Sequence, residues 1–361
     1  MTTQQIVNPS QIESELVHIW ESLDKTNKMR ACLFNLIVFN QLSSRTDYIR
    51  NIVQKIIDTF PCRVLFVSHD NDPSKSYLKT AVSVMAAQGK SSTVCDDIDI
   101  GVAGSDWERV PYVILPHIVP DLPVYLLWAE DPSETHPLFQ PLAKLATRII
   151  FDSESADSLF GFAQSLLTFK EQKGLDIADL NWARLEGWRD LLASTFDSKE
   201  RLGDLHDVKE IFITYNARET EFFCHLKIQA MYMLALLSAR LGWRFQSVEG
   251  QKGSYRFHFD HGISATIESC FWPDLGSGSI TSMGITSNRQ AHYHFVRNQK
   301  QLHQVTVHIS TAERCELPYQ FILGKSQIGQ SLVREIFLKG TSHFFLQMLH
   351  QLTLLDKEKI C

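Results

Sequence analysis

Two tryptophans and two arginines lie close together in the stretch DLNWARLEGWRDLLASTFD, residues 179–197. They are Trp182, Arg184, Trp188 and Arg189. Trp and Arg are the residue types that contribute most often to the binding energy of protein interfaces. The stretch therefore permits two interpretations, a helix that packs inside this chain and a helix that contacts another protein.

Helical periodicity places the large side chains of this stretch on two faces. Leu185, Trp188, Leu192 and Phe196 recur at helical spacing, which predicts one buried stripe. Trp182 lies about 120° from Trp188 around a helix axis with about 3.6 residues per turn. We expect this helix to pack between two bodies, and two domains of the same chain are enough to provide them.

Two glycine-containing stretches resemble cofactor motifs without completing them. QGKSS at residues 88–92 contains Gly-Lys-Ser, but the glycine that a phosphate-binding loop requires five residues earlier is replaced by Val84. GSGS at residues 276–279 would need a third glycine where Thr281 stands. Both stretches are predicted to be turns, and no nicotinamide, flavin or other cofactor is indicated.

No set of residues indicates catalysis or a metal site. His292 and His294 share one face of a predicted strand, but no third ligand stands at a recognised spacing. Asp96 and Asp97 alternate with apolar residues and are expected on the solvent face of a strand. HExxH, GxSxG and DxDxDG are all absent from the sequence. We therefore predict a protein that is not an enzyme.

The elements that would position these residues differ between the two halves of the chain. In the first half, short apolar runs alternate with helical patterns, which predicts parallel strands in βαβ units. An amphipathic helix is expected near the start, capped by Ser10, and the apolar run at 110–129 is expected to form strand, turn and strand. Four prolines in that run argue against a membrane span. The remaining predicted strands of this half are residues 31–40, 63–68, 80–86, 92–102 and 148–153.

The second half predicts alternating strands joined by tight turns. A long buried helix is expected at residues 219–241, and two helices near 327–338 and 342–354 close the chain. We predict an α/β N-terminal domain with a mixed, mostly parallel sheet at residues 1–175. An α+β C-terminal domain with an antiparallel sheet is predicted at residues 176–361. Residues 171–179 are expected to be the linker.

Composition limits the class of protein further. The chain of 361 residues has a formal net charge of −6, which argues against a general nucleic-acid binder. The N-terminus has no secretion signal, and the seven cysteines form no disulfide framework. We expect a cytoplasmic protein with reduced thiols, bound neither to nucleic acid nor to a membrane.

The sequence resembles the glucose-6-phosphate dehydrogenase assembly protein family, the OpcA-type proteins. The DLNW-x-R motif followed by Trp-Arg carries the resemblance, and VPDLPVYLLW, TVCDDIDI and RACLFNLIVF agree with it in order. The resemblance implies a bacterial, non-catalytic activator that binds glucose-6-phosphate dehydrogenase and favours its active oligomer. Such a protein would support entry into the pentose phosphate pathway of carbohydrate metabolism.

The resemblance assigns the motif positions Asn181, Trp182, Arg184, Trp188 and Arg189. We hypothesise that Asn181 and Arg184 fix the domain junction, and that one tryptophan contributes to the partner surface. Redox control, which the family implies for some photosynthetic members through two neighbouring cysteines, is not transferred. Here Cys315 and Cys361 are the last two cysteines, and they are far apart in sequence.

Two alternatives remain open. One is an enzyme of sugar-phosphate metabolism, with its site at the carboxyl ends of the first sheet's strands. Titratable groups with shifted pKa values at that edge would favour it. The other is a scaffold that also senses a phosphosugar or a nucleotide in a pocket.

Overall fold

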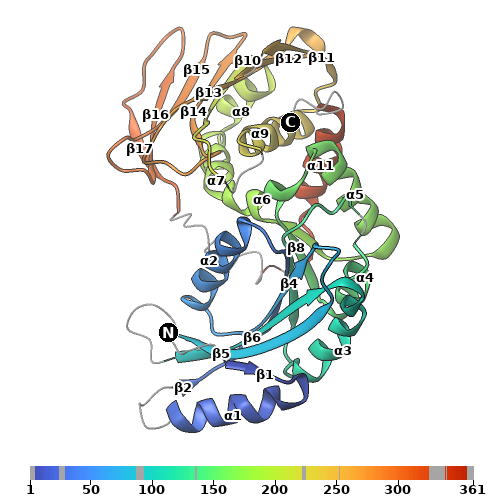
Figure 1. Ribbon diagram of the computed structural model, residues 1–361. Helices are drawn as coiled ribbons and strands as arrows, with labels where there is room; N and C mark the ends of the chain where they lie inside the picture. Colours follow the sequence, from blue (N-terminus) through green and yellow to red (C-terminus); the bar gives the residue numbers. More distant parts are fainter. Residues whose placement is uncertain are drawn as a thin grey trace. The chain divides into compact units, whose positions relative to one another are not determined.

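The chain divides into two compact units, each built from three segments. The first unit comprises Met1–Ala156, Thr168–Leu180 and Gln327–Thr341, and the second comprises Asp157–Leu167, Asn181–Ser326 and Ser342–Cys361. The domain boundary expected after residue 175 stays a prediction. The computed structural model (Figure 1) describes residues 5–23, 29–86, 93–134, 136–221, 225–251, 253–324, 338 and 340–355.

The first sheet contains six adjacent strands that run parallel, followed at one edge by antiparallel strands. The parallel part has the order β6-β4-β3-β7-β8-β9, which is the strand order 3-2-1-4-5-6 of dinucleotide-binding folds. This confirms the mixed, mostly parallel sheet. The strands are β1 (Gln5–Val7), β2 (Met29–Arg30), β3 (Asn35–Gln41), β4 (Arg63–Asp70), β5 (Tyr77–Ala86), β6 (Thr93–Ala103), β7 (Val124–Trp128), β8 (Arg148–Phe151) and β9 (Ile177–Asp179).

The connections around this sheet follow the same plan with one exception. Helix α2 (Arg45–Ile57) joins β3 to β4, and α4 (Phe139–Leu145) joins β7 to β8 on the opposite face of the sheet (Figure 1). Between β4 and β6 the chain forms the antiparallel strand β5 where the dinucleotide-binding fold has a helix. The expected hairpin is confirmed in its strands, whereas QGKSS lies outside the described residues.

Two local predictions in the first unit were wrong. Residues 110–117 form α3 (Val110–Ile114) and a 3-10 turn, because each of its two prolines stands in the first turn of a helix, where no N–H is needed. Helix α1 (Ile12–Leu23) is preceded by a 3-10 turn, which Asn8 caps in place of Ser10.

The expected linker is also regular structure. It contains the end of α5 (Leu159–Lys173), a helix that contributes to both units, and strand β9, which pairs with β8. The apolar residues Ile177 and Ala178 of β9 are buried, and burial explains why this short segment joins the sheet.

The second sheet is mostly antiparallel, in the order β11-β12-β13-β10-β14-β15-β16-β17. The prediction of a wholly antiparallel sheet needs one correction, because β10 and β13 pair in parallel. The chain leaves β10, passes through α9 and returns through the β11–β12 hairpin, and this crossover permits parallel pairing. The strands are β10 (Val208–Asn216), β11 (Phe245–Gln251), β12 (Ser254–Phe259), β13 (Ser264–Cys270), β14 (Ile280–Ser287), β15 (His292–Arg297), β16 (Gln304–Ser310) and β17 (Tyr319–Ile322).

Helices cover one face of the second sheet, and side chains on the other face are exposed to solvent. Residues of β14 and β15 alternate between buried and exposed, as a sheet with one wet face requires. The helices are α6 (Leu180–Arg184), α7 (Glu186–Thr195), α8 (Lys199–His206), α9 (Ile228–Leu241) and α11 (His343–Leu355). None of the helices described in either unit is long and apolar enough to cross a membrane.

Helix α9 begins later than expected. Residues 219–221 are not helical, and the helix starts at Ile228, where its continuous buried run begins. It ends at Gly242, whose φ of 72° is the left-handed conformation that glycine adopts at little cost. The helix expected at 342–354 is confirmed as α11. The helix expected at 327–338 falls on residues that are not described, apart from Leu338.

Candidate functional site

The tryptophan-rich motif forms two short helices and not one. Helix α6 ends at Arg184, Leu185 forms a turn, and α7 begins at Glu186. Next to this turn, a Cβ atom on Gly187 would lie 3.3 Å from the Cβ of Leu323. The small residue therefore allows the helix to pack closely against the segment that follows β17.

The first tryptophan of the motif is enclosed by aromatic and cationic groups of the second unit. The guanidinium of Arg189 lies 3.7 Å from the ring centroid of Trp182, and the ring of Phe345 lies 5.4 Å away. Arg184 donates a hydrogen bond of 3.0 Å to the Oδ1 of Asn181. These contacts join α6 and α7 to α11.

The second tryptophan supports a buried cation. The guanidinium carbon of Arg297, on β15, lies 5.7 Å from the ring centroid of Trp188. Each tryptophan of the motif thus carries an arginine over its ring, an arrangement that stabilises the cation electrostatically. Trp188 reaches the sheet through this contact.

Neither indole is available on the surface. Trp182 is 3% exposed and Trp188 is 2% exposed, and Asn181 is buried as well. A partner would therefore meet the residues that cover the indoles. The proposed roles of the five motif residues in partner binding or at a domain junction stay predictions.

The carboxyl edge of the first sheet is the position where dinucleotide-binding folds hold their cofactor. The turn after β3 reads Gln41-Leu42-Ser43-Ser44, and no glycine occurs between residues 31 and 88. Glycines in this turn normally allow a pyrophosphate to approach the helix N-terminus. Here Ser43 Oγ accepts the N–H of Arg45 and Thr46 Oγ1 accepts the N–H of Ser43, so this chain's own hydroxyls cap the turn.

Carboxylates of this chain also face that turn. Glu130, which follows β7, accepts the backbone N–H of Gln41 at 2.5 Å. Arg45 Nη2 donates to Asp152 at 2.6 Å, and its Nη1 donates to the carbonyl of Glu154. An anionic ligand at this edge would meet negative charge, because carboxylates already take the donors that a phosphate would use.

Titratable groups at this edge have shifted pKa values. Burial raises the pKa of Glu130 to about 7 and lowers that of His136 to about 4. His136 Nδ1 accepts the N–H of Leu138, so its Nε2 carries the hydrogen and donates to His69 Nδ1 at 3.2 Å. Both imidazoles are neutral in this arrangement, and burial also lowers the pKa of His69. Such groups at this edge are the feature expected of the enzyme alternative.

The carboxylate at the end of the second parallel strand is already paired. Dinucleotide-binding folds use an acidic residue at about this position to bind a ribose hydroxyl. Here Asp70, the last residue of β4, accepts hydrogen bonds from Lys75 Nζ at 2.9 Å and from Tyr77 Oη at 3.1 Å. The hydrogen bond from Lys75 lowers the pKa of Asp70.

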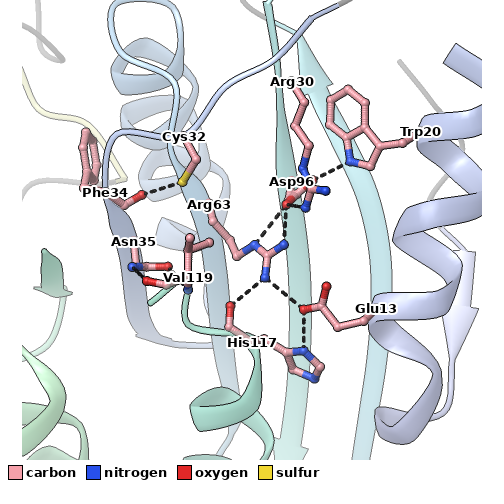
Figure 2. Close-up of polar contacts among 10 residues, drawn as sticks. All are labelled: Glu13, Trp20, Arg30, Cys32, Phe34, Asn35, Arg63, Asp96, His117 and Val119. Carbon is pink, nitrogen blue, oxygen red and sulfur yellow. Dashed lines mark hydrogen bonds and ion pairs between the residues drawn. The ribbon is translucent and has the colours of Figure 1, made fainter. Parts of the chain in front are cut away.

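A second polar cluster lies at the opposite, amino edge of the sheet (Figure 2). Arg63, the first residue of β4, directs Nε and Nη2 at Asp96 and Nη1 at Glu13 of α1. Asp96 also accepts the indole N–H of Trp20 at 2.7 Å and a bond from Arg30. The cluster binds helix α1 to β4 and β6, and its saturated hydrogen bonds indicate a structural role.

Asp96 and Asp97 correct the sequence prediction, because both are buried and not on a solvent face. Asp97 accepts the hydroxyl of Ser83 at 2.9 Å, and burial raises its pKa to about 7. The partners, Arg63 and Ser83, come from other strands, so no local sequence signal announced them.

The remaining predicted features give no site. GSGS precedes β14 as a turn. His292 and His294 are exposed on β15. The described part of the chain contains no group of three or more ligands that could hold a metal ion. Cys315 is an exposed free thiol, and Cys361 lies outside the described residues.

The fold and the carboxyl edge together define a class: a reductase-like chain without the glycine turn of a dinucleotide site. A solved structure of similar fold is KijD10, a 3-ketoreductase from Actinomadura kijaniata in complex with NADP. It has a TM-score of 0.52 and 8% identity, over 91% of this chain and 96% of that chain.

Sequence models of protein families then place the chain. Two models match it, and they describe the two domains of a "Glucose-6-phosphate dehydrogenase subunit". The model of the N-terminal domain matches residues 53–166, and the model of the C-terminal domain matches residues 175–332. The chain belongs to the OpcA-type glucose-6-phosphate dehydrogenase assembly family, which confirms the resemblance.

Curated relatives carry the name "Putative OxPP cycle protein OpcA". The protein from a Synechocystis strain is 30% identical over 213 residues, 57% of this chain and 42% of that protein. The protein from Nostoc punctiforme is 27% identical over 208 residues, 55% of this chain and 42% of that protein. The matched region thus spans less than half the length of either relative.

Proposed function

We propose that this protein is a non-catalytic assembly factor and allosteric activator of glucose-6-phosphate dehydrogenase in the cytoplasm of a bacterium. The observation that carries the proposal is membership of the assembly family over most of the chain. The turn after β3 supports it, because the hydroxyls of Ser43 and Thr46 and the carboxylate of Glu130 take the N–H groups there.

Activation requires that the protein bind one conformation or assembly state of the dehydrogenase more tightly than the other. A tenfold change in the dehydrogenase's substrate affinity corresponds to about 1.4 kcal/mol of coupling. One well-packed contact at the interface is sufficient for that.

The test is NADP reduction by purified glucose-6-phosphate dehydrogenase from the same organism, with and without this protein, together with size-exclusion chromatography of the mixture. We expect co-elution, a larger dehydrogenase assembly, and a higher rate or a lower KM for substrate. Separate elution with unchanged kinetics would contradict the proposal.

The same assay tests the motif. Arg189→Gln removes the cation over Trp182, and Asp190→Asn changes the exposed neighbouring residue as a control. At a temperature where both variants are folded, a loss of activation by Arg189→Gln alone would support a role of the motif in partner binding. Equal activation by both would limit the motif to packing within the second unit.

A sugar-phosphate enzyme is the second candidate, favoured by the shifted pKa values of Glu130 and His136. NADP binding to the isolated chain, measured by titration calorimetry, distinguishes the two candidates. The assembly-factor proposal expects no binding at millimolar NADP. Micromolar binding that Glu130→Gln alters would favour the enzyme.

A further inference from the structure

A pocket of about 800 Å³ lies within the second unit, where β13 and β15 end and β14 begins. Its volume is within the range of small-molecule sites in proteins. The lining combines two cations, two aromatic residues and a group of hydroxyls, and the residues used below are Arg297, Lys300, Phe271, Trp272, Thr281 and Ser282.

Arg297 is a buried cation without a carboxylate partner among the described residues. Its side chain is 7% exposed, and its hydrogen bonds run to the carbonyls of Ile280 and Leu302. Trp188 of the family motif lies beneath the guanidinium. Burial lowers the pKa of Arg297 to about 10, so the group is still charged at neutral pH. An uncompensated buried charge is costly, and an anionic ligand would offset that cost.

The charge of the lining favours an anion. Lys300 lines the same pocket, and its side chain forms no ion pair with a described residue. The loop that carries it is held in place, because Asn298 Oδ1 accepts the N–H groups of Lys300 and Gln301. Asp274 is the one carboxylate in this lining, so two cations outnumber it.

The aromatic wall of the pocket is held in a fixed position by a buried asparagine. Asn216 donates to the carbonyls of Trp272 and Leu275 at 2.9 Å, and its Oδ1 accepts the N–H of Trp272 at 2.9 Å. This arrangement fixes the loop that presents Phe271, whose side chain is 73% exposed. A large apolar ring held at the rim of a polar pocket suits the apolar face of a sugar ring.

The opposite side of the pocket carries hydroxyl groups. Thr214 Oγ1 lies 2.6 Å from Thr281 Oγ1 and 2.6 Å from Ser282 Oγ. Hydroxyl groups both donate and accept, which matches the hydroxyls of a carbohydrate. The lining therefore supplies donors and acceptors for a sugar beside cations for a phosphate.

We propose that this pocket binds a small phosphorylated sugar, with the phosphate at Arg297 and Lys300 and the sugar between the aromatic and hydroxyl walls. The proposal goes beyond activation of the dehydrogenase, because it concerns a ligand of this chain alone. Its test contains no dehydrogenase, so failure of one proposal leaves the other standing.

The experiment measures binding of glucose 6-phosphate, inorganic phosphate and glucose to the purified full chain by titration calorimetry and thermal shift. We expect glucose 6-phosphate to bind and to raise the Tm, with at least tenfold weaker binding of inorganic phosphate and of glucose. Lys300→Gln should weaken glucose 6-phosphate binding about tenfold, and Arg297→Lys should weaken it further, because lysine lacks the planar fork.

Lys199→Gln, at an exposed lysine outside the pocket, is the matched control and should bind as the unaltered chain does. Because Arg297 is buried, that variant is interpreted with Lys300→Gln, whose exposed side chain can be changed without loss of packing. The proposal is overturned by no binding at millimolar glucose 6-phosphate, by equal binding of inorganic phosphate, or by unchanged binding in Lys300→Gln.

Discussion

At the scale of single residues, the structure replaces solvent-exposed polar groups with buried and paired ones. Asp96 and Asp97 alternate with apolar residues, a pattern that normally marks a wet strand face. Their partners lie 33 and 14 residues away in sequence, on other strands. Sequence reasoning found the strand, but it could not find a pairing that only the folded sheet brings together. The same holds for Arg297 over Trp188.

Asp97 gives a prediction on the pH dependence of stability. Its pKa is raised to about 7 by burial and by the nearby Asp99, against an unfolded value of about 4. The folded state therefore keeps a proton that the unfolded chain releases, and stability falls as the pH rises from about 4 to about 7. Asp97→Asn removes this loss, by up to about 4 kcal/mol.

The measurement is urea unfolding of both proteins at pH 5 and pH 8. We expect the gain in unfolding free energy from Asp97→Asn to be larger at pH 8. Glu108→Gln, at an exposed position, is the control and should show no such difference. An equal gain at both pH values would show that Asp97 ionises normally.

At the scale of elements, sequence periodicity predicted most strands and the long helices, and it failed where local rules compete. The run at 110–116 is apolar enough for a strand, yet its prolines stand in the first turns of helices. The tryptophan stretch has helical periodicity throughout, but packing against Leu323 divides it after Arg184. The site at the sheet edge was predictable by its position only, because Glu130 and His136 belong to no motif.

Helix α1 supplies the prediction at this scale. Asp96→Asn leaves Arg63 buried beside a neutral group and weakens the attachment of α1. We expect a loss of about 3–5 kcal/mol in unfolding free energy, as for other broken buried ion pairs. Glu13→Gln changes a partner of the same arginine that is 47% exposed, and should cost about 1 kcal/mol or less. Chemical denaturation measures both, and similar losses would contradict the assignment.

At the scale of the whole molecule, the mostly parallel first sheet and mostly antiparallel second sheet followed from alternation and run length. The parallel β10–β13 pair did not, because it results from a hairpin inserted between distant segments. The return of residues near 340 to the first unit was equally hidden. Thr341 Oγ1 accepts the N–H of Ile177, and Arg148 donates to the carbonyls of Leu338 and Gly340.

A fragment of residues 1–175 should therefore fail to fold. It lacks strand β9 and the residues near 340 that bind Arg148. We expect a fragment of residues 1–180, which restores β9, to be more soluble but still without a cooperative transition. Circular dichroism during thermal unfolding, with the full chain as reference, measures this. A sharp transition in the shorter fragment would contradict the prediction.

The three-segment construction of each unit also sets the order in which the protein can fold during synthesis. Residues 327–341 complete the first unit and residues 342–361 complete the second. Domains usually fold one after another as they emerge from the ribosome, the N-terminal domain first. Here both units wait for the last part of the chain, so a nascent chain exposes two unfinished sheets until translation is almost over. A ribosome stalled shortly before residue 327 would hold a chain that needs chaperones, however stable the finished protein is.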